Sequence, residues 1–204
     1  MTGPFFELDL DTLSGLKPLR PVVFSLGGNQ GEVLETLQEA VAHLRRTPEV
    51  ILTGISRVYA TDPWGVTDQP EFLNIVLLAE STMPSTVLLE RGQAIEDALG
   101  RVRGEKWGPR TIDIDLIQVG ARVRNDPHLV LPHPHAHERA FVLVPWLDAD
   151  QDAELLGHGR VADLVAGMDC SGVRLVPDAV VELEAANPGL DLRGTARTLA
   201  GLRR

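Results

Sequence analysis

Apolar residues along the chain follow two different periods, and these periods predict the order of its secondary structure. Short runs rich in β-branched and apolar residues predict four strands, at residues 21–26, 50–60, 72–80 and 111–119. Apolar residues at three- and four-residue steps predict two helices, at residues 31–46 and 84–100. Asn29 stands where a helix N-cap is expected, and Gly100 stands where a helix typically ends.

The predicted order is strand, helix, strand, strand, helix, strand, which indicates an α+β protein with a ferredoxin-like βαββαβ core. Such a core has a mostly antiparallel sheet with both helices packed on one face. Beyond residue 120 the pattern weakens, with a short helix expected at 160–168 and a short strand at 172–176. The chain is therefore divided into an N-terminal extension (1–20), one domain (21–176) with C-terminal additions to its core, and a C-terminal tail (177–204).

Composition narrows the class of protein. The 204 residues are 44% hydrophobic and 24% charged, as in ordinary globular proteins, and no apolar run approaches the ~18 residues of a membrane span. A net charge of −10 argues against general nucleic-acid binding, which needs a basic surface. Cys170 is the single cysteine, which excludes an intrachain disulfide. With no signal peptide recognisable at the N-terminus, a cytoplasmic location is expected.

A basic cluster interrupts this acidic chain. The stretch "RVRGEKWGPR" contains Arg101, Arg103, Lys106 and Arg110, with Trp107 among them. The cluster is too short to follow a nucleic-acid duplex, but the planar guanidinium groups suit the oxygens of a nucleoside triphosphate. An indole can pack against a purine or a cation. Taken alone, the stretch could equally be a solvated linker.

Two aspartates follow the basic cluster within a predicted strand. Asp113 and Asp115 alternate with apolar residues, so they point to one face of the strand with Cα atoms roughly 6.5–7 Å apart. Two neighbouring carboxylates repel each other, and a divalent cation would offset this repulsion. Two solvated acids on a wet sheet face are the alternative. Beside the basic cluster, the pair favours a magnesium–nucleotide site for phosphoryl transfer.

Other motifs carry less information. Neither the G-x-x-x-x-G-K-[ST] phosphate loop nor the G-x-G-x-x-G fingerprint is present, and "LGGNQG" is interpreted as a tight turn from strand to helix. The run "HPHAH" places His133, His135 and His137 on alternate positions, which raises the possibility of zinc binding. Prolines interrupt this run, so we favour structural or solvent-facing roles for the second and third histidines.

The stretch "RVRGEKWGPRTIDIDL" resembles the signature of the 6-hydroxymethyl-7,8-dihydropterin pyrophosphokinase family. Four further stretches follow in the family's order: "SLGGNQG", "YATDPWGVTDQPEFLNIV", "QAIEDALGRVR" and "LPHPHAHERAFVLVPW". The resemblance covers about residues 21–150 and agrees with a ferredoxin-like fold. It implies an enzyme of folate biosynthesis that transfers pyrophosphate from ATP to the hydroxymethyl group of 6-hydroxymethyl-7,8-dihydropterin and releases AMP.

The resemblance also implies roles for individual residues. It makes Asp113 and Asp115 the ligands of two Mg²⁺ ions, and these two with Arg101 and Arg110 the catalytic residues. The implied ATP-binding residues are Gln93, Glu96, Arg101, Arg103, Trp107, Arg110, His133 and Arg139. The implied pterin-binding residues are Thr61, Asp62, Trp64, Phe72, Asn74 and Phe141. ATP is the expected co-substrate, and a monomer without nucleic-acid or membrane partners is expected.

Some positions depart from the family pattern, and other functions stay open. Gly28 stands where Ser is usual, Asp62 where Pro is common, Trp64 where an aliphatic residue is usual, and Pro134 where an aromatic residue is common. These departures affect the contacts to the pterin and to adenine rather than the reaction. A Mg-dependent nucleotide hydrolase or an ordinary γ-phosphoryl kinase is an alternative enzyme. A nucleotide-sensing module without turnover is an alternative of another class.

Overall fold

The computed structural model describes residues 17–63, 68–101 and 108–183. The chain alternates between strands and helices up to residue 119, and shorter elements follow. In chain order these are β1 (Arg20–Gly28), α2 (Val33–Arg45), β2 (Val50–Ile55), β3 (Tyr59–Thr61), β4 (Phe72–Ser81), α3 (Ser85–Ala98), β5 (Asp113–Val119), β6 (Arg124–Asn125), β7 (Val130–Leu131), the 3₁₀ helix η1 (Ala136–Glu138), α4 (Ala140–Ala149), β8 (Glu154–Leu155), β9 (Gly159–Arg160), α5 (Val161–Ala166) and β10 (Val173–Leu175).

The main sheet has six strands in the order β10-β3-β4-β1-β5, and β2 pairs with β4 beyond the end of β3. Every pairing described in it is antiparallel. The single strand predicted at 50–60 is therefore wrong, because it is divided into β2 and β3. The side chain of Ser56 explains the division: its hydroxyl accepts the N–H of Val76 at 2.9 Å, in the place of a backbone carbonyl.

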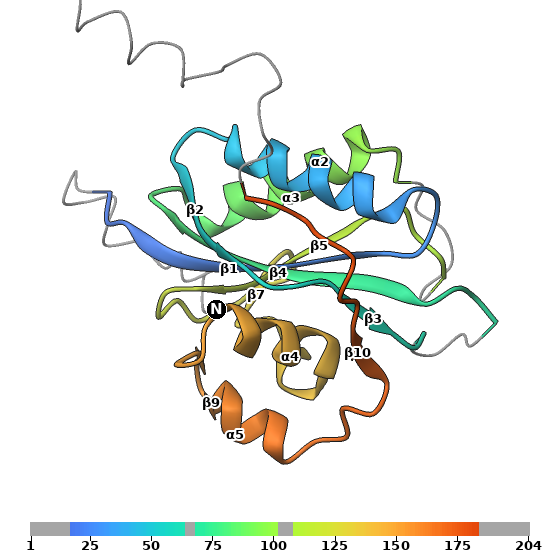
Figure 1. Ribbon diagram of the computed structural model, residues 1–204. Coiled ribbons are helices and arrows are strands. Elements are labelled where there is room, and N and C mark those ends of the chain that lie inside the picture. The colour runs from blue at the N-terminus through green and yellow to red at the C-terminus, as the bar shows by residue number, and fades with distance from the viewer. Residues whose placement is uncertain (1–16, 64–67, 102–107, 184–204) are drawn as a thin grey trace, which may run out of the picture.

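Helices cover both faces of this sheet (Figure 1). The helices α2 and α3 lie together on one face, which confirms the predicted ferredoxin-like arrangement, and bury side chains such as Phe24, Leu37 and Leu88. The helices α4 and α5 lie on the opposite face over a second apolar cluster, which includes Val76 and Trp146. The sequence pattern did not predict α4, because its continuous apolar run has no helical period.

Two local features also test the sequence interpretation. Asn29 is not the N-cap of α2, since Glu32 occupies that position without a capping side-chain bond. Gly100 follows α3 with a φ of +79°, a conformation that glycine adopts without strain, as its position predicted. The segment after β10 packs along α2, where Gln38 donates to the carbonyl of Glu182 at 2.9 Å. In the described ranges, no helix combines the length and the apolar character needed to cross a membrane.

Candidate active site

The register of the sheet assembles the site. Residues opposite each other on antiparallel strands point to the same face. Asp113 of β5 lies opposite Gly27 of β1, and Gly27 lies opposite Asn74 of β4. Two residue pairs along, and so on the same face, Asp115 lies opposite Ser25. Small residues on β1 therefore separate the two aspartates from Asn74 and leave space above the sheet.

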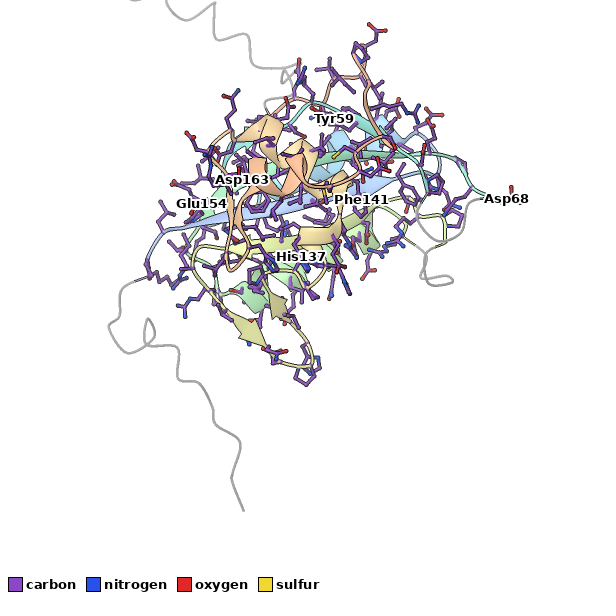
Figure 2. All side chains as sticks on the ribbon, turned by 90° about the horizontal axis from the view of Figure 1, so that it is seen from below. Tyr59, Asp68, His137, Phe141, Glu154 and Asp163 are labelled. Atoms are coloured by element: carbon purple, nitrogen blue, oxygen red, sulfur yellow. The ribbon has the colours of Figure 1, made fainter. Side chains whose placement is uncertain are left out.

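An open pocket of about 620 Å³ occupies this space. It lies on the face covered by α4 and α5, the side from which Figure 2 views the molecule and shows Phe141 near the start of α4. Its lining residues come from β1, β3, β4, β5 and α4, and from the segments next to them: Ser25, Gly27, Thr61, Asp62, Phe72, Asn74, Arg110, Asp113, Asp115, Arg139 and Phe141. Elements far apart in the sequence thus share one cavity.

Asp113 forms ion pairs with two arginines. Arg101 Nη1 lies 2.6 Å from one of its carboxylate oxygens, and Arg110 Nη1 lies 2.5 Å from the other. Arg101 also contacts Glu96, a buried carboxylate of α3 that accepts the backbone N–H of Ile114 at 2.6 Å. Burial raises the pKa of Glu96, while the Ile114 N–H and Arg101 oppose this rise. Glu96 therefore joins Arg101 to the strand that carries both aspartates.

Asp115 has different partners, which lie just before α4 in the chain. Arg139 donates to its carboxylate at 3.0 Å, and His133 Nε2 lies 4.0 Å from the same oxygen. Burial and the neighbouring charge of Asp113 raise the pKa of Asp115 to about 6, against the opposing effect of Arg139 and Arg110. This carboxyl group is thus held where positive charge is needed to stabilise its ionised form.

His133 faces the site as a neutral side chain. Burial, with the charges of Arg139 and His135, lowers its pKa to about 4. Its Nδ1 accepts the backbone N–H of His135 at 3.2 Å, so Nε2 carries the proton and can donate into the site. The ring of His137 stacks on that of His158, with centroids 4.1 Å apart, and His135 pairs with Glu138. The second and third histidines of "HPHAH" therefore make contacts outside the pocket.

The other end of the pocket is lined by an amide and by two aromatic rings. Asn74 is buried and donates to the hydroxyl of Thr61 at 2.8 Å. A Cβ at position 27 would lie 2.3 Å from Asn74 Oδ1, so Gly27 makes room for this amide. Phe72, at the start of β4, and Phe141, at the start of α4, line the same cavity. This end can hold a flat heterocycle and read its polar edge.

Asn29 is a residue of the site that the sequence analysis missed. Its backbone N–H donates to the carbonyl of Arg110, and its side-chain oxygen accepts the N–H of Arg110, both at 2.9 Å. Its amide also donates to Gln69 Oε1 at 3.1 Å and to the carbonyl of Pro70 at 2.9 Å. Asn29 therefore ties the turn after β1 to Arg110 and to the segment that leads into β4. The Gly-rich turn around it was the one available signal.

The structure brings most of the predicted site residues together. Nine of them line the pocket, namely Thr61, Asp62, Phe72, Asn74, Arg110, Asp113, Asp115, Arg139 and Phe141. Glu96, Arg101 and His133 reach it through the contacts above. Gln93 lies on α3 with its side chain exposed and is not among the lining residues. Trp64, Arg103 and Trp107 fall outside the described residues.

Comparison with known proteins identifies the family of this chain. The family model described as 7,8-dihydro-6-hydroxymethylpterin-pyrophosphokinase matches residues 23–151. The chain belongs to this family. Proteins named 2-amino-4-hydroxy-6-hydroxymethyldihydropteridine pyrophosphokinase are similar along most of their length: one from Pseudomonas aeruginosa is 37% identical over 79% of this chain and 99% of its own. One from Mycobacterium leprae is 42% identical over 82% of this chain and 94% of its own.

Solved structures show the same fold. The HPPK-DHPS protein of Plasmodium falciparum, crystallised with pteroate, superposes with a TM-score of 0.59 at 12% identity. The match covers 74% of this chain and spans 44% of that longer protein. The family and the α+β fold class predicted from the sequence are thereby confirmed. So is the expected class of enzyme, a pterin pyrophosphokinase of folate biosynthesis that uses ATP as co-substrate.

Proposed function

We propose that the pocket transfers pyrophosphate from ATP, bound at its Asp113–Asp115 end, to 6-hydroxymethyl-7,8-dihydropterin, bound at its Asn74 end. The cross-strand row of Asp113, Gly27 and Asn74 carries this proposal. On one side of Gly27 it places a carboxylate that could bind a metal ion, and on the other side an amide that could hydrogen-bond to a pterin ring. The hydroxymethyl oxygen loses its proton to solvent and forms a bond to the β-phosphorus of ATP. The bond from that phosphorus to the α–β bridging oxygen breaks, and AMP leaves.

The donor set fits magnesium. Two partly buried carboxylates project side by side, and three guanidinium groups contact them, so the site accommodates concentrated positive charge. Within the described part of the chain, no group of three or more His, Cys, Asp and Glu side chains could hold a metal ion. Mg²⁺ needs only one or two protein carboxylates when phosphates and water complete its shell. Asp113 and Asp115 would hold two such ions, which when bound neutralise phosphate oxygens and ease attack on phosphorus.

The arginines and the histidine of the site would bind the nucleotide. Arg101, Arg110 and Arg139 now pair with carboxylates, and their guanidinium groups suit phosphate oxygens equally well. The neutral His133 would donate from Nε2 to ATP, and Glu96 would keep Arg101 in place. Other residues assigned to the nucleotide on the family resemblance are Gln93, Arg103 and Trp107.

Phe72 and Phe141 would stack on the two faces of the pterin, since a flat bicyclic ring gains contact area from such packing. Asn74 would hydrogen-bond to its amide-like edge, with its orientation set by Thr61. Asp62 lies in the same wall of the pocket, and Trp64 is assigned to that wall on the family resemblance. We further propose a monomer that works in the cytoplasm without nucleic-acid or membrane partners, in keeping with a net charge of −10.

Product analysis tests the proposed reaction. The protein is incubated with ATP and Mg²⁺, with and without 6-hydroxymethyl-7,8-dihydropterin, and the nucleotides are separated by chromatography. AMP that forms only in the presence of the pterin is the expected result. ADP or free phosphate would indicate an ordinary kinase or a hydrolase instead. Bound ATP without turnover would indicate a nucleotide-sensing module. Titration of the ATP complex with Mn²⁺, followed by EPR, is expected to show two bound ions.

A further inference from the structure

The strand β10 borders the pterin end of the pocket although it lies beyond the matched residues 23–151. It pairs with β3, with Val173 opposite Thr61 and Arg174 opposite Ala60. The backbone N–H of Asp62 donates to the carbonyl of Gly172 at 3.1 Å. The C-terminal part of the chain therefore supports the strand that presents Thr61 and Asp62 to the cavity.

Arg174 joins the two ends of the connection between β3 and β4. Its Nη2 lies 3.2 Å from Asp62 Oδ1 and also contacts Glu71 Oε1. Asp62 follows Thr61 in the wall of the pocket, and Glu71 precedes Phe72, which also lines the pocket and lies opposite Thr61 on β4. One guanidinium group thus joins the two residues at which the connection leaves β3 and enters β4.

The surroundings of this contact are acidic. A second cavity adjoins the first and shares Thr61, Asp62, Arg139 and Phe141 with it. Its lining adds Glu138 and Asp169 to Asp62, and Arg139 in it already pairs with Asp115. Without Arg174, the carboxylates of Asp62 and Glu71 would lose the guanidinium group that contacts both of them, and their mutual repulsion would be less well balanced.

We propose that Arg174 is a positioning residue for the pterin, which holds Asp62 and Glu71 together just beyond the Thr61–Phe72 pair and so keeps this edge of the pocket in the shape that the ring requires. This inference rests on the proposed function of the pocket. Asp62 supplies one of the two carboxylates. Because the family commonly has Pro at this position, which cannot form an ion pair, we do not expect this contact in relatives that carry the proline. Arg174 acts through the pocket wall and touches neither the aspartate pair nor its arginines.

The contact is placed to affect binding more than folding. The side chains of Arg174, Asp62 and Glu71 are 50%, 65% and 52% exposed, and exposed ion pairs add little to global stability. The pairing of β10 with β3 does not depend on the Arg174 side chain, because backbone bonds make it. Loss of the guanidinium group should therefore loosen the pocket wall while the sheet stays intact.

The test is an equilibrium titration of the full chain with 6-hydroxymethyl-7,8-dihydropterin, together with steady-state kinetics. In Arg174→Ala, the Kd and KM for the pterin are expected to rise about three- to tenfold, in the range of one or two weak charge contacts. The Kd for ATP and the kcat should stay within about twofold of the wild type. Arg124→Ala is the matched control, since Arg124 lies on β6 outside the pocket and pairs with Asp126.

Two rescue variants separate positioning from a general loss of structure. Arg174→Lys keeps the charge and should recover part of the pterin affinity. Glu71→Gln placed in the Arg174→Ala background removes the repulsion and should also recover affinity. Unchanged pterin binding in Arg174→Ala, an equal loss in Arg124→Ala, or no recovery in either rescue variant would overturn the inference. A wild-type chain that does not bind the pterin at all would instead refute the proposed function.

Discussion

The two faces of the main sheet differ in function, and strand β5 contributes side chains to both of them. On the α2–α3 face, Ile112, Ile114 and Leu116 lie within the larger apolar core. On the α4–α5 face, Ile117 joins the smaller core, but Asp113 and Asp115 open into the pocket. The apolar side of the strand anchors it, so two mutually repelling carboxylates can be held in place on its other side. Substitutions on β5 should therefore separate activity from stability.

The largest expected effect is the loss of activity in Asp115→Asn. Removal of a proposed metal ligand should lower kcat on the order of a thousandfold or more, equivalent to ~4 kcal/mol in the barrier. The free energy of unfolding should change little or rise, because burial and Asp113 make the charged form of Asp115 costly. Steady-state kinetics and urea denaturation measure the two quantities. Wild-type activity in this variant would contradict the metal assignment.

The opposite result is expected one residue away, on the apolar face. Ile114→Ala leaves a cavity in the larger core and should lower the free energy of unfolding by about 2–4 kcal/mol. Its kcat, measured well below the melting temperature, should stay within about tenfold of the wild type, since the backbone N–H bonded to Glu96 remains. Ile51→Ala is the control, because Ile51 is 56% exposed on β2 and should cost little. Similar losses at the two isoleucines would refute the distinction between the faces.

A smaller effect is expected from Gly27→Ala. This substitution tests the cross-strand row of Asp113, Gly27 and Asn74, which spans the pocket. The new Cβ would lie 2.3 Å from Asn74 Oδ1 and must displace this amide. The Kd for the pterin should rise about tenfold, the typical result of losing one or two hydrogen bonds, while ATP binding is retained. Titration with each ligand measures this. Gly167→Ala, where the added Cβ meets only ordinary contacts, is the control, and equal pterin binding in both variants would contradict the role of Gly27.

The smallest effect expected is a pH-dependent change in stability from the ion pair between Asp148 of α4 and Arg57, which lies between β2 and β3. Burial alone would raise the pKa of Asp148, but hydrogen bonds from Arg57 hold this pKa below its usual range. A lowered folded-state pKa contributes stability above the unfolded value of about 3.9, and this contribution is lost as the pH falls through the folded-state value. Asp148→Asn should therefore be less stable than the wild type at pH 7. Denaturation at pH 7 and pH 3 should show the difference shrinking at the lower pH, and a constant difference would argue against this ion pair.

The sequence predicted the types of residue in the candidate site better than it predicted the hydrogen bonds and ion pairs that link them. The aspartate pair and the arginines stand in a sequence pattern that predicts a magnesium–nucleotide site, whereas Phe72 and Phe141 were assigned to the pterin only through the family resemblance. Asn29 was misread as a helix cap, because an Asn after glycines suits a cap as well as a link between segments. Glu96 was assigned to the nucleotide, but its burial and its bond to Ile114 depend on how α3 packs against β5. The role of Arg174 could not be recognised from the sequence, because its partners Asp62 and Glu71 lie more than 100 residues away in the chain.

The sequence by itself determined the periods of the helices and strands in the βαββαβ core, and therefore the fold class and the face to which Asp113 and Asp115 point. Side-chain alternation in a strand and the helical repeat are local properties of the backbone, so they can be read from neighbouring residues. Only the tertiary structure decided that β2 and β3 separate at Ser56, that α4 covers the second face, and which arginine meets which carboxylate. Those outcomes depend on strand register and on the packing of distant segments, where a shift of one residue moves every side chain to the other face.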